Sequence, residues 1–106
     1  MKIWLDDNFS PPDETWVWYD NALNLIEALK SKCLPISTLS LDHDLGDERE
    51  VGNGYMVMEW LENETWTNDD YLPPNISIHT ANPVAKQKMN AALSSIKKAL
   101  DTRYTI

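Results

Sequence analysis

The sequence is poor in cysteine, glycine and histidine, and each shortage excludes a class of fold or site. Its 106 residues include one cysteine, three glycines and two histidines. The single cysteine, Cys33, excludes a disulfide framework and a cysteine-based zinc site, and it fits a reducing cytoplasm. The few glycines form neither a Walker loop nor a dinucleotide-binding fingerprint, and Gly52-Asn53-Gly54 indicates only a loop.

Long apolar runs are also missing. No run approaches the roughly 18 residues that a membrane-spanning helix needs, so we expect no membrane contact. The N-terminal segment MKIWLDD becomes acidic at residue six, which is not typical of a signal peptide, and we expect a cytoplasmic protein. A chain of 12.2 kDa has the size of one domain, predicted to span residues 1–106.

Basic residues are scarce, and their distribution is uneven. The net charge of −8 argues against an extended nucleic-acid-binding surface, which needs clustered lysine and arginine. Residues 1–70 carry a net charge of −12, whereas residues 71–106 carry +4. An acidic body with a basic end suits a small anionic ligand held through a divalent cation. Ordinary solubility with a basic last helix explains the charge equally well.

The apolar pattern predicts four short strands and three helices. The predicted strands are residues 2–5, 16–19, 36–41 and 75–78, and the predicted helices are residues 22–31, 55–64 and 83–100. Residues 8–15 contain Pro11 and Pro12 and are predicted to form a loop, while Asp20 is a candidate cap for the first helix. This alternation indicates an α/β domain with a parallel sheet, right-handed crossovers and helices on its faces. The tryptophans are expected mainly in the core.

Polar side chains follow three of the predicted strands at the point where each strand ends. They are Asp6 and Asp7; Asp42, His43 and Asp44; and His79 and Thr80. In an open parallel sheet, ligands bind in the crevice at the carboxyl ends of the strands. The sequence therefore predicts one site built from three distant segments.

Carboxylates that converge at one edge repel each other unless a cation lies among them. Oxygen ligands without cysteine favour Mg²⁺, or Mn²⁺ as a substitute, over Zn²⁺. The predicted metal ligands are Asp6, Asp7 and Asp42, and Asp44 is a candidate for a group that holds a metal-bound water or replaces one of these ligands. The alternative is that single acids after strands only begin loops or cap helices.

The two histidines and the start of the last helix supply the other candidate groups. His43 and His79 are predicted to divide acid and base roles, with Asp44 beside His43, although either histidine could instead be a structural residue. Asn82-Pro83 predicts a helix N-terminus, where free N–H groups attract anions. Thr80, Asn82 and Lys86 are therefore predicted to bind phosphate.

These motifs resemble response-regulator receiver domains. The resemblance rests on the acid pair after Leu5, on Asp42 after the third predicted strand, on Gly54 before a helix, and on Ile78-His79-Thr80-Ala81. More narrowly, KIWLDD, SLDHDLGD, GNGY with MEWLE, and HTANPVAKQKM resemble the divergent cyclic-phosphate-processing receiver domains, over residues 2–96. The resemblance implies a three-layer flavodoxin-like domain with a sheet of about four strands and flanking helices.

The resemblance also implies a metal-assisted activity on cyclic phosphates, with Asp6, Asp7 and Asp42 in an acidic metal pocket. The expected partner is a small phosphorylated ligand or an RNA terminus, and the expected substrates are RNA 2′,3′-cyclic ends or cyclic nucleotides. Two alternatives stay open: a non-catalytic module that sequesters such a ligand, and a degenerate receiver phosphorylated on Asp42. The second is disfavoured because no fifth strand ending in Lys-Pro follows the last helix.

Overall fold

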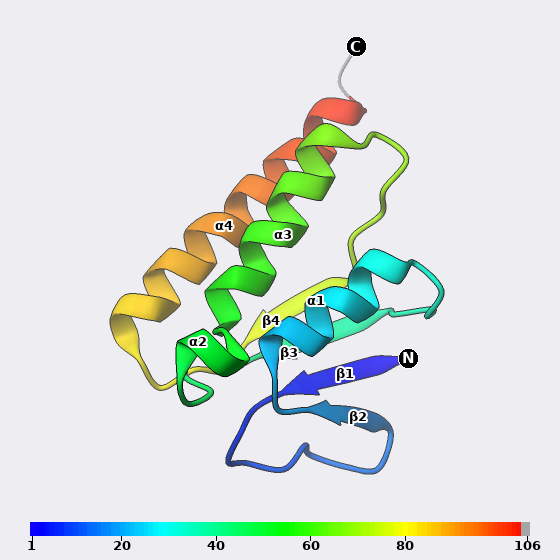
Figure 1. Ribbon diagram of the computed structural model, residues 1–106. Helices are drawn as coiled ribbons and strands as arrows, with labels where there is room; N and C mark the ends of the chain where they lie inside the picture. Colours follow the sequence, from blue (N-terminus) through cyan, green and yellow to red (C-terminus); the bar gives the residue numbers. More distant parts are fainter. Residues whose placement is uncertain (105–106) are drawn as a thin grey trace.

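One parallel sheet of four strands forms the base of the computed structural model, which describes residues 1–104 (Figure 1). The strands are β1 (Lys2–Leu5), β2 (Trp16–Tyr19), β3 (Thr38–Leu41) and β4 (Asn75–Ile78). Their spatial order is β2-β1-β3-β4, so the two inner strands are β1 and β3. All three pairings are parallel, and all four predicted strands are therefore confirmed.

The helices lie together on one side of this sheet (Figure 1). They are α1 (Ala22–Ser31), α2 (Glu48–Val51), α3 (Gly54–Thr67) and α4 (Pro83–Arg103). The chain moves in one direction across the sheet from β2 to β3 and from β3 to β4. Right-handed crossovers therefore place α1 and α3 on the same face, and α3 packs between α1 and α4.

The core forms where alternate strand residues meet these helices. Ile3, Leu5, Leu39 and Leu41 are fully buried, and the register places Ile3 opposite Leu39 and Leu5 opposite Leu41. The helices add apolar residues at helical spacing, namely Leu25, Ile26, Leu29, Val57, Met58, Leu61, Met89, Ala92 and Ile96. Because this face of the sheet is buried, the register of the strands is fixed. The positions of the residues that follow the strands are fixed with it.

The opposite face of the sheet carries no helix within residues 1–104. From β1 to β2 the chain moves across the sheet in the other direction, so a right-handed connection lies on this second face. Residues 6–15 form this connection, and they contain no helix. Lys2, Trp4 and Trp18 point to this face by strand alternation, and Trp18 is 49% exposed. The receiver-like α/β class is confirmed, with a loop where the third layer would lie.

Several local predictions differ from the structure. The predicted strand 36–41 begins only at Thr38, and the predicted loop 45–54 contains the short helix α2. The last helix continues to Arg103, and Ile106 lies outside the described residues. Asn21, not Asp20, caps α1, because the Asn21 side chain accepts the Asn24 N–H.

The tryptophans were expected mainly in the core, and that expectation is wrong. None of the tryptophans is buried in the described chain: three are half-buried, and Trp18 and Trp66 are about half exposed. No helix among residues 1–104 combines the length and the apolar character needed to cross a membrane.

Candidate functional site

Three carboxylates from two strand ends converge at the carboxyl edge of the sheet. One oxygen each from Asp6, Asp7 and Asp42 lie within 4.8 Å of one another. Asp6 and Asp7 follow β1, and Asp42 follows β3, so the pairing of these inner strands brings them together. Oxygen atoms at this separation can share one divalent cation, which fits the predicted ligand set.

Asp6 is the buried member of this cluster, with 2% of its surface exposed. Its Oδ1 accepts the N–H groups of Asn8 (2.9 Å) and Phe9 (3.0 Å), so the loop after β1 wraps around the carboxylate. Its Oδ2 lies 3.0 Å from Nε2 of His79. A buried carboxylate needs such partners to offset the loss of hydration.

His79 is held on three sides by the chain itself. Its Nε2 faces Asp6, its Nδ1 lies 2.8 Å from the Ser40 hydroxyl, and its ring stacks on Trp4 with centroids 3.9 Å apart and planes 7° apart. With Nε2–H donating to the Asp6 carboxylate, Nδ1 accepts from Ser40. Both ring nitrogens are thus engaged, and the ring orients Asp6.

Asp42 occupies the half-buried centre of the edge. Burial raises the pKa of its carboxyl, and the neighbouring Asp6 charge adds to this. The His43 N–H, which donates to Asp42 Oδ1 at 2.8 Å, and the Thr80 hydroxyl act in the opposite direction. The net upward shift means that the fold disfavours the ionised form of Asp42.

His43, Asp44 and Asn82 form a second connected group. Nδ1 of His43 lies 2.8 Å from Asp44 Oδ1, and Nδ2 of Asn82 donates to Asp44 Oδ2 at 3.3 Å. The hydrogen bond from His43 is the main cause of a lowered Asp44 pKa, which keeps this exposed carboxylate ionised. A ring that donates from Nδ1 presents the lone pair of Nε2, as a general base requires.

The predicted phosphate-binding residues are only partly brought together. Thr80 is buried and accepts the Asn82 N–H, and Asn82 caps α4 by accepting the Ala85 N–H at 3.1 Å. Pro83 has no N–H, so the first turn of α4 offers few donors to an anion. Lys86 is exposed, and its ammonium forms no ion pair within the part of the chain that the structure describes.

Several neighbours of the site were not identified from the sequence. Ser40, Trp4 and Phe9 contact His79 or Asp6, but they are ordinary strand or loop residues when taken alone. A signal was present for Ser40, which interrupts the apolar run Leu39-Ser40-Leu41 at the position that faces away from the helices. Its partner, His79, is 39 residues away, which no local pattern can indicate.

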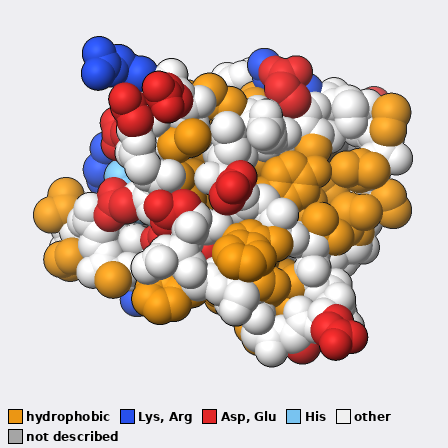
Figure 2. Space-filling view, turned by 60° about the horizontal axis from the view of Figure 1, so that its bottom comes forward, with side chains coloured by type: hydrophobic (Ala, Val, Ile, Leu, Met, Phe, Trp, Pro, Cys, Tyr) orange, Lys and Arg blue, Asp and Glu red, His pale blue; other side chains and the backbone are white. Residues whose placement is uncertain are grey.

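A cavity of about 290 Å³ opens beside the carboxylates, lined by Trp4, Asp6, Phe9, Asp42, His79 and Ala81. A neighbouring cavity of about 400 Å³ is lined by Asp7, Trp18 and Asp20. Figure 2 shows acidic side chains gathered next to hydrophobic ones on this side of the molecule. The carboxyl edge therefore combines a charged centre with apolar walls.

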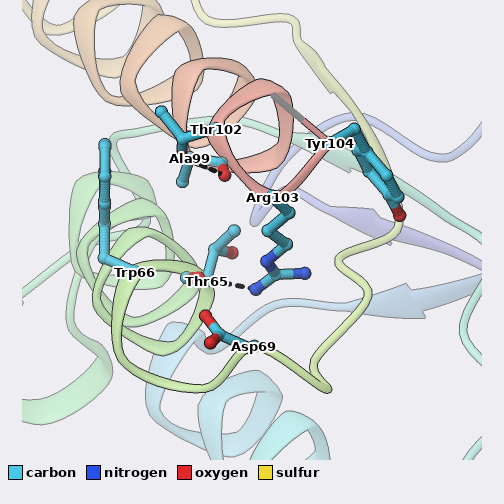
Figure 3. Close-up of a pocket in the computed structure, with 7 residues that line it drawn as sticks. All are labelled: Thr65, Trp66, Asp69, Ala99, Thr102, Arg103 and Tyr104. Atoms are coloured by element: carbon cyan, nitrogen blue, oxygen red, sulfur yellow. Dashed lines mark hydrogen bonds between the residues drawn. The ribbon is translucent and has the colours of Figure 1, made fainter. Parts of the chain in front are cut away.

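The cavity of about 490 Å³ between α3 and α4 is larger, but it contains none of the predicted site residues (Figure 3). Its floor is Arg103, which donates to the backbone carbonyls of Thr65, Asn68 and Tyr71. These contacts join the end of α4 to the end of α3. We interpret this cavity as a structural junction.

A comparison with protein families found a match that covers most of the chain. The family model described as the cyclic-phosphate processing receiver domain matches residues 1–95. The search of curated proteins and the search of solved structures gave no match. The matched segment contains the carboxylate cluster and both histidines, and it ends within α4.

Proposed function

The chain belongs to the cyclic-phosphate processing receiver domains, and on that premise we propose that it is a metal-dependent phosphoesterase that opens a cyclic phosphate ester. The observation that carries the proposal is the convergence of Asp6, Asp7 and Asp42 beside the His43–Asp44 pair. The cluster fits Mg²⁺ or Mn²⁺, because its donors are hard carboxylate oxygens at the mouth of a cavity. When bound, such a cation polarises a phosphoryl group and neutralises charge on its oxygens.

In this proposal His43 is the residue that moves a proton. Asp44 accepts from Nδ1 and stabilises the charged ring, so Nε2 takes a proton from the attacking water and later returns it to the leaving ribose oxygen. Asn82 holds the second oxygen of Asp44 and thereby fixes the plane of the pair. The Thr80 hydroxyl accepts the Asn82 N–H and so helps to hold Asn82 in place.

His79 has a positioning role here, which differs from the acid–base role expected from the sequence. Both of its ring nitrogens contact groups of the chain, and its face is covered by Trp4. It therefore orients the Asp6 carboxylate, as residues that hydrogen-bond to metal ligands commonly do. The sequence predicted that His43 and His79 divide the acid and base roles. In this proposal His43 acts as the base in the first step and as the acid in the second.

The test is turnover of a panel of 2′,3′- and 3′,5′-cyclic nucleotides with Mg²⁺ or Mn²⁺. Anion-exchange chromatography separates the ring-opened monoesters from the cyclic substrates. We expect metal-dependent ring opening that is lost with EDTA, in Asp42→Asn and in His43→Ala. Asp70→Asn, which changes an exposed carboxylate outside the cluster, is the matched control. An intact panel under all conditions would contradict the proposal.

A non-catalytic binding module is the second candidate, and the engagement of His79 favours it. With both ring nitrogens of His79 engaged by Ser40 and Asp6, His43 is the histidine left for proton transfer, and one such group is a sparse set for two-step chemistry. Calorimetry distinguishes the two functions: a binding module gives a metal-dependent heat of binding, and the ligand is recovered unchanged.

A further inference from the structure

The face of the sheet that carries no helix brings aromatic side chains next to the carboxylates. Trp4 and Trp18 lie side by side in the register of β1 and β2, and the ring of Trp16 meets the ring of Trp4 edge to face at 5.7 Å. Phe9 follows in the loop after β1 and is 68% exposed. An exposed aromatic ring at the mouth of a polar site is a surface that a flat ligand can cover.

Phe9 is tied to the candidate metal site through its backbone on both sides. Its N–H donates to Asp6 Oδ1 at 3.0 Å, and its carbonyl accepts the indole N–H of Trp4 at 2.9 Å. The chain therefore fixes the position of residue 9 relative to a carboxylate of the cluster. Its side chain makes no hydrogen bond and extends into the wall of the adjacent cavity.

The lining of this cavity separates into two parts. Asp6, Asp42 and His79 form the polar part at the strand ends, while Trp4, Phe9 and Ala81 form the apolar part. Its volume of about 290 Å³ is at the lower end of the range for small-molecule sites. The apolar part offers flat surface and few hydrogen-bonding side chains, which suits an aromatic ring better than a polyhydroxylated sugar.

We propose that Phe9, with Trp4 and Ala81 around it, forms a nucleobase subsite, so that the ligand of this site is a cyclic nucleotide bound at both its phosphate and its base. This inference rests on the proposed function, because it assigns the base-binding part of the same site. The phosphate lies at the carboxylate cluster, and the base stacks on the exposed Phe9 ring. Stacking on an aromatic ring tolerates every base, so the subsite selects nucleotides over other cyclic phosphates without strong preference among bases.

The experiment compares two ligands that differ only in the base. One is adenosine 2′,3′-cyclic phosphate, and the other is 1-O-methylribose 2,3-cyclic phosphate, which has a methoxy group in place of the base. Affinity is measured by calorimetry with Mn²⁺ on the His43→Ala chain, in which turnover is expected to be lost. We expect the nucleotide to bind about fivefold to 150-fold tighter, which is the affinity ratio that stacking of about 1–3 kcal/mol per base gives.

Variants of Phe9 test which side chain is responsible. Phe9→Leu keeps apolar volume but removes the ring, and it should reduce the preference for the nucleotide to about twofold or less. Phe9→Tyr keeps the ring and should retain the preference. Tyr104→Leu removes a ring that is also largely exposed, at the far end of α4, and should not change the preference.

The outcomes separate this inference from the proposed function. If both ligands bind equally and both lose affinity in Asp42→Asn, the base subsite is overturned while the metal-dependent phosphate site stands. A preference that persists in Phe9→Leu also overturns it. If neither ligand binds with Mn²⁺, both the proposed function and the subsite fail.

Discussion

Gly54 begins α3 directly against the backbone of Asp42, and a β-carbon at residue 54 would overlap the Asp42 carbonyl oxygen. The contact is fixed by the Gly54 N–H, which donates to the carbonyl of His43 at 3.0 Å. The N-terminus of α3 thus supports the segment that carries Asp42 and His43. A residue without a side chain is required here because of the close approach of two backbones.

Gly54→Ala is therefore expected to displace the Asp42 segment and destabilise the fold. Overpacking against backbone costs about 1–3 kcal/mol or more, and the clash cannot be relieved by rotating a side chain. Urea unfolding measures the loss, and the Mg²⁺-induced shift in Tm measures the displacement of the site. Ser94→Ala, at an exposed position of α4, is the control and should leave both unchanged. A fully stable Gly54→Ala with an unchanged metal response would contradict the packing.

Asp42→Asn is expected to stabilise the metal-free chain at neutral pH. The folded state raises the Asp42 pKa above its usual value of 3.8, so the folded chain favours the protonated form. Its ionisation therefore costs stability as pH rises through the raised pKa, and the cost is absent below the unfolded value. Removing the charge should raise Tm by a few degrees at pH 7 in EDTA, since about 1 kcal/mol shifts Tm by roughly 4–8 °C in a domain of this size.

The same variant should lose its response to metal. Saturating Mg²⁺ should raise the Tm of the unmodified chain, because a ligand that binds only the folded state stabilises it. It should leave Asp42→Asn almost unshifted. At pH 3, where the carboxyl is protonated in both states, the Tm difference between the two chains should disappear. A variant that is less stable than the parent in EDTA at pH 7 would show that Asp42 is a structural residue.

Ser40→Ala should weaken metal binding without direct contact to the cluster. It removes the hydroxyl that engages Nδ1 of His79, so the ring that orients Asp6 loses one of its two anchors. Loss of such a partner typically lowers metal affinity about 10–100-fold. Mn²⁺ titration by calorimetry measures the change.

Ser77→Ala is the matched control for that substitution. Ser77 lies opposite Ser40 in the β3–β4 register, but it is exposed and its hydroxyl reaches only the Leu39 carbonyl at 3.5 Å. It should bind Mn²⁺ as tightly as the parent chain. If Ser40→Ala and Ser77→Ala lost the same affinity for Mn²⁺, the loss would reflect a general disturbance of the sheet and not the contact between Ser40 and His79.

Asn82→Ala and Asn21→Ala together separate capping from function. Both asparagines cap a helix through Oδ1, and each substitution should cost about 1 kcal/mol of unfolding free energy. Only Asn82 also donates to Asp44, so only Asn82→Ala should lower turnover, by about tenfold. Chemical denaturation and initial rates on the best substrate check both expectations. If the two variants had equal initial rates, Asn82 would have no role in turnover beyond capping α4.

Much of the fold could be predicted because its signals are local. The four strands and three longer helices follow from apolar periodicity, and the acids and histidines after Leu5, Leu41 and Ile78 follow from strand ends. The carboxylate cluster was predictable because parallel pairing places strand ends at one edge. The absence of a helix in residues 8–15 was equally clear from the paired prolines.

The remaining features depend on contacts between distant residues. The pairing of His79 with Ser40 and Asp6 requires three strands in register, and the sequence shows only that each residue is polar. The exposure of Trp18 depends on which face lacks a helix, whereas tryptophan alone favours burial. None of the residues of α2 is buried, so its sequence has no apolar stripe from which a helix could be predicted.

The carboxyl edge draws its groups from residues 6 to 82, so the full set is present only after β4 has paired with β3. During synthesis, a nascent chain that ends before β4 has both acid pairs but neither His79 nor Asn82. Such an intermediate can attract a cation through its carboxylates, but it lacks the groups that orient them. The groups that orient these carboxylates are therefore present only when the sheet is complete.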